Sequence, residues 1–508
     1  MNQQTAIVIG SGFGGLGAAI RLQSQGWQVT LLEKRGEPGG RASVIHQDGF
    51  TFDAGPTLIT MPELLDDLWK QAGRRLSDYV TIKPLDPFYR IWYADGRHID
   101  YTGDPDQMRA RIAQFSERDA TAYEPFLTHT RRIYAEAFDR LGHQPFLTLG
   151  SMVKVLPKLI ALAAHRPVYS LAAKYFTHPY MRMLFSFHPL FIGGNPFRAS
   201  SVYSIVPYLE RTGGVHFAMG GMTSLVNGMV RLLQDLGGQI RLNSPVREII
   251  VHDGRATGVL LETGEPLKAE AVISNADATY TYRRLVPASH RKRWTDSKLD
   301  GLHQSMSCFL IYLGTNRKYP HLKHHNIIMS DRYRGLLTDI FERKVLADDF
   351  SLYLHVPTRT DPSLAPPGGE SMYILAPVPH LGDGIDWAQA AHPFRDRILR
   401  FLEANLGMDG LEQAIATERL FTPEDFAAQY NAWQGSAFSI EPILTQSAWF
   451  RPHNASEEIP GLYLVGAGTH PGAGLPGTLL TAEITARLVS SQTRQPEPIR
   501  KGVVDVVH

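Results

Sequence analysis

Residues 5–22, "TAIVIGSGFGGLGAAIRL", decide the fold, because an apolar strand pattern leads through closely spaced glycines into a helical pattern. Glycine has no Cβ, so Gly10 permits a tight turn, Gly12 lets a ligand approach the main chain, and Gly15 lets the helix pack on the strand. A helix that begins near Gly12 directs its unpaired N–H groups toward the loop, which favours a pyrophosphate. The stretch therefore predicts a dinucleotide site.

The following segment supports this interpretation over a chance strand-to-helix turn. After Gly26, which is expected to end the helix, "WQVTLLEK" forms a second apolar strand that ends at Glu33. An acidic residue about 20 residues beyond the glycines is where a ribose-binding carboxylate is needed, and it would repel a 2′-phosphate. The pattern favours NAD or FAD and disfavours NADP.

A second glycine loop follows at Gly39, Gly40 and Arg41. The planar guanidinium of an arginine binds phosphate oxygens in pairs, so this loop suits a second contact to a pyrophosphate. A surface turn with a solvated arginine is the alternative.

The end of the chain repeats the arrangement of its beginning. Residues 461–489, "GLYLVGAGTHPGAGLPGTLLTAEITARLV", read as an apolar strand, a glycine loop and a helix with Pro476 near its first turn. N–H groups at such a helix start suit the electron-rich edge of a flavin, although a helix cap without a ligand would look similar. We predict that both chain ends form one nucleotide-binding domain.

Composition narrows the class of protein. The chain has 508 residues, 43% of them hydrophobic, and a formal net charge of +1, so no global field attracts nucleic acid. The single cysteine, Cys308, is expected to be a buried core residue. We expect no signal peptide and no membrane-spanning segment, hence an intracellular protein.

The expected organisation is α/β: a Rossmann-like domain assembled from both chain ends, a mixed α+β substrate domain and a helical membrane-contacting insertion. The helix predicted at 222–236 is followed by strands in 239–251, 256–264 and 269–277 that we expect to form a small meander. The predicted divisions are an FAD-binding domain (1–85, 213–300 and 441–490), a substrate-binding domain (86–150 and 301–440), a helical membrane-associated segment (151–212) and a polar tail (491–508).

With these motifs in place, the chain resembles the bacterial and fungal phytoene desaturases, FAD enzymes of carotenoid biosynthesis. The resemblance runs nearly end to end, and its most specific segments are "FTFDAGPTLIT", "FSFHPLFIGGNPF", "GGMTSLVNGM", "VISNAD", "LTQSAWFRPHN" and "YLVGAGTHPGAGLPGTLLTAEITA". It implies an FAD-binding set that comprises Gly10, Gly12, Gly14, Gly15, Glu33, Lys34, Gly40, Arg41, Gly55, Pro56, Thr57, Val246, Asn275, Gly468, Thr469, Gly474, Leu475 and Pro476.

The resemblance further implies stepwise desaturation of phytoene toward neurosporene or lycopene, with oxygen or a quinone as electron acceptor. A carotenoid isomerase or a desaturase of another polyene on the same fold stays open. A non-catalytic prenyl-binding chaperone is a less favoured alternative, because Arg41 and the final glycine loop are intact.

A hydrocarbon substrate comes from lipid, and residues 151–187 mix apolar side chains with basic ones and almost no acids. This composition fits an in-plane contact with anionic lipid and fits an ordinary core-facing helix pair about equally. The resemblance favours peripheral association with the cytoplasmic side of the cell membrane.

No general base can be chosen from spacing. His188, His355 and His380 lie in apolar neighbourhoods, and each is expected to be a hydrogen-bonded core or surface histidine. "LKHHN" (322–326) lacks helical spacing and nearby carboxylates, so we expect a solvated turn and no metal site.

Overall fold

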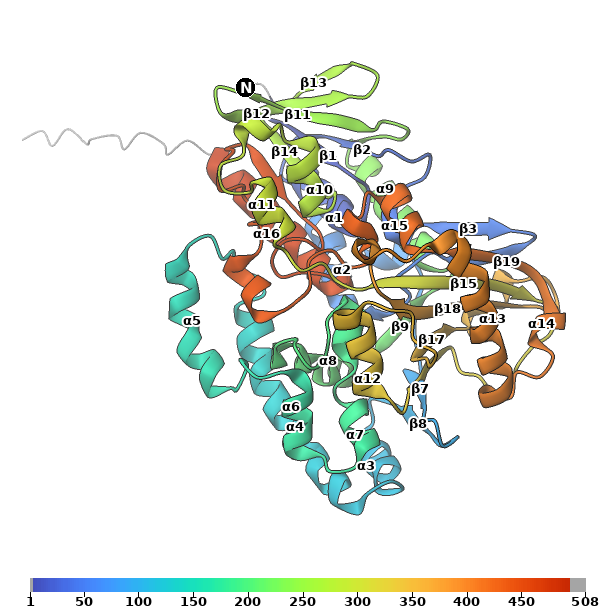
Figure 1. Ribbon diagram of the computed structural model, residues 1–508. Helices are drawn as coiled ribbons and strands as arrows, with labels where there is room; N and C mark the ends of the chain where they lie inside the picture. The colour runs from blue at the N-terminus through green and yellow to red at the C-terminus, as the bar shows by residue number, and fades with distance from the viewer. Residues whose placement is uncertain (1–2, 494–508) are drawn as a thin grey trace, which may run out of the picture.

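A parallel five-stranded sheet forms the centre of the nucleotide-binding part of the molecule (Figure 1). The computed structural model describes residues 3–493. The strand order is β10-β2-β1-β14-β20, and the strands are β1 (Thr5–Ile9), β2 (Gln28–Leu32), β10 (Gln239–Arg241), β14 (Ala271–Ser274) and β20 (Leu462–Leu464). Strands from the first, middle and last parts of the chain therefore share one sheet.

Three helices pack beside this sheet: α1 (Phe13–Ser24), α9 (Met222–Asp235) and α16 (Leu475–Thr493). The predicted helix 222–236 is thus present, and Gly237 follows it with a φ of 86°. α16 extends three residues into the predicted polar tail, and the rest of that tail lies outside the described residues.

The prediction that the strands in 239–251, 256–264 and 269–277 form one meander is wrong. β10 and β14, at the two ends of that region, join the parallel sheet, while β11 (Val246–His252), β12 (Arg255–Leu261) and the unpredicted β13 (Pro266–Lys268) form the antiparallel meander. All four residues of β14 are buried, and a short strand buried on both faces is typical of a parallel sheet. Two short helices follow: α10 (Ala278–Tyr280) and α11 (Asp296–Asp300).

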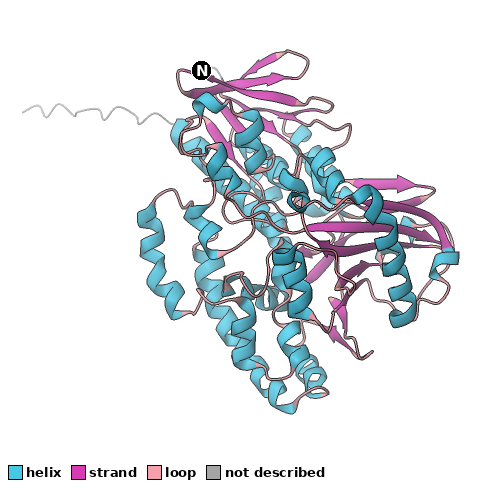
Figure 2. Cartoon of the chain, in the orientation of Figure 1, coloured by secondary structure: helices cyan, strands magenta, loops and turns pink. Residues whose placement is uncertain are grey.

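A seven-stranded sheet forms the second part, on the right in Figures 1 and 2. Its order is β19-β15-β18-β17-β16-β7-β8, with β7 (Tyr89–Trp92), β8 (His98–Tyr101), β15 (Ser307–Thr315), β16 (His325–Ile328), β17 (Leu352–His355), β18 (Glu370–Val378) and β19 (Ile415–Phe421). The associated helices are α12 (Tyr333–Thr338), α13 (Trp387–Leu406), α14 (Leu411–Ala414) and α15 (Pro423–Tyr430). The remaining short strands are β3 (Val44–Gln47), β4 (Phe50–Asp53), β5 (Ile59–Thr60), β6 (Ile82–Pro84) and β9 (Val215–Ala218).

"LKHHN" is not a solvated turn, so that prediction is wrong. His325 and Asn326 begin β16, which lies between β17 and β7, and both side chains have no exposed surface. The ring nitrogens of His324, His325 and His355 lie within 4.8 Å of one another. His324 donates to or accepts from Thr360 and His355, and Tyr353 bonds His325 Nδ1 at 2.7 Å, so partners on other strands compensate the burial.

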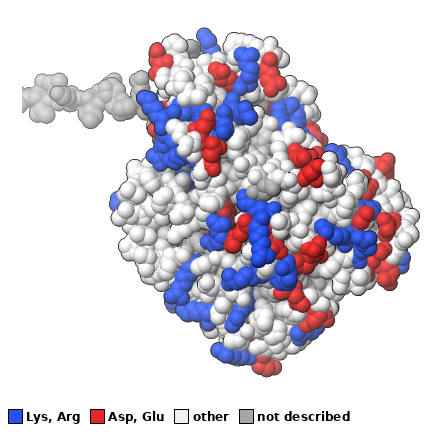
Figure 3. Space-filling view, in the orientation of Figure 1, with Lys and Arg blue, Asp and Glu red and all other residues white. Residues whose placement is uncertain are grey.

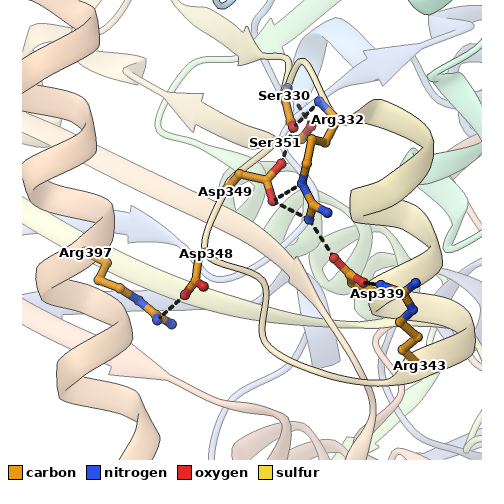
Figure 4. Close-up of polar contacts among 8 residues, drawn as sticks. All are labelled: Ser330, Arg332, Asp339, Arg343, Asp348, Asp349, Ser351 and Arg397. Carbon is orange, nitrogen blue, oxygen red and sulfur yellow. Dashed lines mark hydrogen bonds and ion pairs between the residues drawn. The ribbon is translucent and has the colours of Figure 1, made fainter.

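An ion-pair network fastens the segment between α12 and β17, as Figure 4 shows. Arg332 binds Asp339 and Asp349 through Nη2 at 2.6 and 2.8 Å, and Arg343 binds Asp339 at 3.0 Å. Ser330 N donates to Ser351 Oγ at 3.1 Å, so the same network holds Ser351 at the start of β17. Both arginines are exposed, whereas Asp339 is buried, so the network fixes this loop around a buried carboxylate.

The helical part lies below the two sheets in the orientation of Figure 1. It comprises α3 (Pro105–Ala113), α4 (Glu117–Tyr134), α5 (Leu149–Ala161), α6 (Val168–Tyr175), α7 (Pro179–Leu184) and α8 (Val206–Gly213), with a π-helical turn over Ala135–Arg140 after α4. α2 (Pro62–Gln71) packs instead against α1 and α16. α6 and α7 bury Leu171, Ala172 and Met181, whereas α5 buries none of its residues. No described helix is long and apolar enough to cross a bilayer.

Candidate functional site

A cavity of about 950 Å³ runs between the parallel sheet, the seven-stranded sheet and the helical part. This volume is at the upper end of the range for small-molecule sites. The first residues after three neighbouring strands line it: Gly10 after β1, Glu33 after β2 and Asn275 after β14. In open α/β sheets, ligands bind at the carboxyl ends of the strands, so the cavity lies where a dinucleotide is expected.

Fifteen of the eighteen predicted cofactor-binding residues line this cavity. They are Gly10, Gly12, Gly14, Glu33, Lys34, Gly40, Arg41, Gly55, Pro56, Thr57, Val246, Asn275, Gly474, Leu475 and Pro476.

The structure does not bring Gly15, Gly468 and Thr469 to the cavity wall. A Cβ at Gly15 would lie 2.0 Å from Gly10 O, so this glycine lets α1 pack against the end of β1. A Cβ at Gly468 would lie 2.6 Å from that of Ala278, and Thr469 Oγ1 donates to Pro452 O at 2.7 Å. These three residues shape the loops behind the cavity.

The first glycine loop is held by Glu33 and Asn275. Ser11 donates to Glu33 Oε2 through its N–H at 2.9 Å and its hydroxyl at 2.6 Å, while Arg35 N donates to Oε1 at 3.0 Å. Asn275 packs against the glycines so closely that a Cβ at Gly14 would lie 2.6 Å from its Oδ1. The Glu33 carboxylate, for which the sequence predicts a contact with ribose, is therefore fixed in place by the protein itself.

Arg41 fits a buried anionic group. The residue is half-buried at the cavity wall, and its buried Nε has no hydrogen-bond partner among the described residues. Burial lowers the pKa of Arg41, and Asp277 acts in the opposite direction. A half-buried guanidinium with a free donor at the cavity wall suits a pyrophosphate, so the residues present fit a dinucleotide cofactor.

Lys34, a member of the predicted cofactor-binding set, makes its hydrogen bonds within the protein. Its Nζ donates to Ala428 O at 2.9 Å and to Asn431 Oδ1 at 2.7 Å, which ties the end of β2 to the end of α15. Burial lowers the pKa of this amine, and Glu33 partly offsets the change. Lys34 thus joins two parts of the cavity wall next to Glu33.

The third glycine loop is fixed by a residue that sequence reasoning missed. Arg451 is fully buried and donates to Gln446 O, Ile440 O and Ala467 O at 2.8 to 3.0 Å. A Cβ at Gly472 would lie 2.7 Å from its Nη1. The arginine sits in the quoted segment "LTQSAWFRPHN", but only the tertiary structure shows that it supports the loop over residues 466–474.

The remaining wall is mostly apolar. Cys308 is buried, as expected, but it also lines the cavity together with Leu310, Tyr353 and Tyr373 from the seven-stranded sheet. The helical part contributes Met152, Val155, Leu159, Phe187, His188, Phe191 and Glu210. One end of the cavity therefore offers N–H groups and a guanidinium, while the other offers hydrocarbon surface.

A glycine-lined dinucleotide site joined to an apolar cavity defines a flavin-dependent oxidoreductase that acts on a hydrophobic molecule. Comparison with known families agrees: residues 13–490 match the model of the flavin containing amine oxidoreductases. The chain belongs to this family and, within it, to the phytoene desaturases. The predicted Rossmann-like α/β fold and the FAD cofactor are thereby confirmed.

Two curated relatives illustrate the similarity. The lycopene-forming phytoene desaturase of Pseudescherichia vulneris is 49% identical over 95% of this chain and 98% of its own length. The neurosporene-forming phytoene desaturase of Cereibacter sphaeroides is 45% identical over 96% of this chain and 95% of its own.

Solved structures share the fold at low identity. An oxidoreductase from Methanosarcina mazei superimposes with a TM-score of 0.65 at 17% identity, covering 96% of this chain and 100% of the other. A putrescine oxidase variant gives 0.64 at 15% identity, covering 97% and 99%.

Proposed function

We propose that this chain desaturates phytoene stepwise to more conjugated carotenes. The observation that supports it most is one continuous cavity with a dinucleotide end and an apolar end, in a chain 49% identical to a lycopene-forming phytoene desaturase. Bound FAD supplies the acceptor for the hydride removed from an allylic carbon. A polyene hydrocarbon offers no hydrogen bonds, so burial of apolar surface and shape hold it.

The chain's own residues position the reactants. Gly55 lies so close to Arg41 that a Cβ would be 2.4 Å from Arg41 O, which brings "GPT" (55–57) against the second glycine loop. Thr57 Oγ1 bonds the Tyr353 hydroxyl at 2.5 Å, which links this loop to β17 of the substrate sheet. The two halves of the cavity are thus joined where cofactor and substrate meet.

We also propose that α5 rests on a lipid surface. Leu149, Val153, Leu156 and Ile160 on α5 are 45 to 59% exposed, while Met152, Val155 and Leu159 line the cavity. The helix thus lies between the cavity and the outside, and Figure 3 shows a broad surface without charged side chains over it. Phe450, in the short turn that contacts α5, is 40% exposed and extends this surface.

The preferred location is the cytoplasmic side of the cell membrane, with oxygen or a quinone as electron acceptor. Exposed basic side chains on the same segment, such as Lys154, suit anionic headgroups.

The decisive test is anaerobic reconstitution with FAD on phytoene-loaded liposomes. Bleaching of the flavin band together with coloured polyenes is expected, and the chromophore length then gives the number of steps. Bleaching must stop after one equivalent until oxygen or a quinone is added, and the faster of the two identifies the acceptor. If FAD binds but no double bond forms, isomerase activity or another polyene replaces this proposal, and if FAD does not bind, a prenyl-binding chaperone does.

A further inference from the structure

A buried carboxyl group on the apolar wall has no role in holding the cofactor. Glu210 on α8 is 1% exposed and lines the cavity beside Leu209 and Val206. Within residues 3–493 it forms no ion pair with a lysine or arginine. Burial of an unpaired carboxylate costs several kcal/mol, and a hydrocarbon cannot hydrogen-bond to it, so substrate recognition does not explain its presence.

The Tyr89 hydroxyl holds one oxygen of Glu210, and His188 in turn holds that hydroxyl. The Tyr89 hydroxyl donates to Glu210 Oε2 at 2.7 Å, and His188 Nε2 lies 3.6 Å from the same atom. Tyr89 OH is also 3.1 Å from His188 Nε2. The phenol has one hydrogen, which it gives to Glu210, so the imidazole Nε2–H donates to the phenol oxygen. Both side chains therefore orient the carboxylate without taking its second oxygen.

The other oxygen, Oε1, accepts no hydrogen bond from a described residue, and its side chain belongs to the cavity wall. Rings enclose the group: Phe187 stacks on His188 with centroids 4.2 Å apart, and Phe191 packs edge-on to Tyr89. The environment has a low dielectric constant, in which a negative charge acts strongly on a nearby developing positive charge.

We infer that Glu210 is the proton acceptor in desaturation, with Tyr89 and His188 as its positioning residues; this rests on the proposed function. Desaturation removes two hydrogens from neighbouring carbons, one as a hydride and one as a proton. Hydride loss makes the adjacent C–H acidic. That C–H bond then breaks, its electron pair becomes the new π bond, and the proton goes to Glu210 Oε1. The proton leaves for solvent before the next cycle.

The titratable groups around Glu210 and Tyr89 come from every element packed against these two residues. Besides Tyr89 on β7 and His188, they are Tyr101 on β8, which stacks on Tyr89 with centroids 5.0 Å apart, and Tyr123 on α4. Arg211 follows Glu210 in α8 and pairs with Glu124 outside. Burial raises the pKa of Tyr123 and of the two stacked tyrosines, so none of the three ionises near neutral pH.

The test compares Glu210→Gln with Glu441→Gln, a buried carboxyl group that does not line the cavity. Bound flavin and phytoene binding are measured first. Glu210→Gln is expected to keep both, to lower kcat by about 100-fold or more with KM within about threefold, and to lose the fall of kcat at low pH. Glu441→Gln is expected to keep the wild-type kcat and pH profile.

Phytoene deuterated at the carbon that loses the proton gives a second readout. Its isotope effect on kcat is expected to grow in Glu210→Gln, because proton removal becomes rate-limiting. Glu210→Asp keeps a carboxylate base and is expected to retain the pH dependence of kcat. It replaces Glu210→Gln as the test variant if the glutamine variant loses its flavin. A Glu210→Gln enzyme with kcat within threefold of wild type, or with a lower kcat but an unchanged isotope effect, overturns the assignment. Wild-type enzyme that makes no coloured polyene instead refutes the proposed function.

Discussion

Replacement of Val153 and Ile160 by serine is predicted to detach the protein from lipid. These side chains are 59% and 53% exposed on α5. Full burial of a Val or Ile side chain is worth about 1.5–3 kcal/mol, so about half of each gives roughly 1 kcal/mol on entry into the acyl region. The double variant should lose about 2 kcal/mol, which is about a 30-fold weaker partition coefficient.

The assay is co-sedimentation with vesicles that contain anionic lipid, repeated with neutral lipid. The matched control replaces Val345 and Leu242 by serine, since these residues are 46% and 36% exposed and belong to other surfaces. The control should bind vesicles as the wild type does. The α5 variant should also lose carotene formation on liposomes and keep it in detergent micelles that deliver phytoene directly.

Equal partitioning of the wild type, the α5 variant and the control would refute the reasoning. So would equal losses in the α5 variant and the control, because the effect would then reflect general surface hydrophobicity. Loss of activity in micelles would show that α5 acts as a cavity wall and not as a lipid contact.

Three further predictions concern the cofactor site and the support of α16. Gly15→Ala places a Cβ 2.0 Å from Gly10 O, so it should lower Tm and the flavin absorbance per protein, whereas Gly301→Ala, whose Cβ would make only ordinary contacts with Lys298 O at 3.5 Å and Ser297 O at 3.6 Å, should change neither. Arg41→Ala should raise the Kd for FAD at least about tenfold in a flavin-fluorescence titration, and Arg41→Lys should recover only part of this; an unchanged Kd would exclude contact with the cofactor. The hydrogen bond to Glu483 raises the pKa of His143 above 6.5. The protonated histidine therefore stabilises the fold fully below about pH 6.5, and this stabilisation is lost as pH rises through the raised pKa. The free energy of unfolding in urea should fall with pH across this range in the wild type and not in Glu483→Gln.

The cofactor end of the site was predictable because its determinants are local. Gly10, Gly12 and Glu33 lie within one strand-helix-strand unit, and parallel strands bring their carboxyl ends to one edge whatever the rest of the chain does. The partner loop at 466–476 was predictable for the same reason, as a second strand, loop and helix.

The buried polar groups were not predictable, because their partners come from distant elements. His325 appears solvated in "LKHHN", yet Tyr353, 28 residues later, bonds its ring across neighbouring strands. Glu210 looks like an ordinary helix-surface acid until Tyr89 and His188, from the 86–192 region, are placed against it. The burial of a polar residue among apolar sequence neighbours can be predicted only when its hydrogen-bond partner is also known.

The cavity has two chemically different ends, and separate parts of the chain form them because each end needs a different kind of wall. Phosphates need fixed N–H groups and a charge, so loops at strand ends provide them and tolerate little movement. A hydrocarbon that is oxidised repeatedly must slide, and an apolar wall without directional bonds permits this. An acid on that wall would hinder sliding if it bound the substrate, but Glu210 Oε2 is held by Tyr89, which His188 supports, so only Oε1 is left to act on the hydrocarbon. This arrangement suits a base that must meet a different C–H at every step.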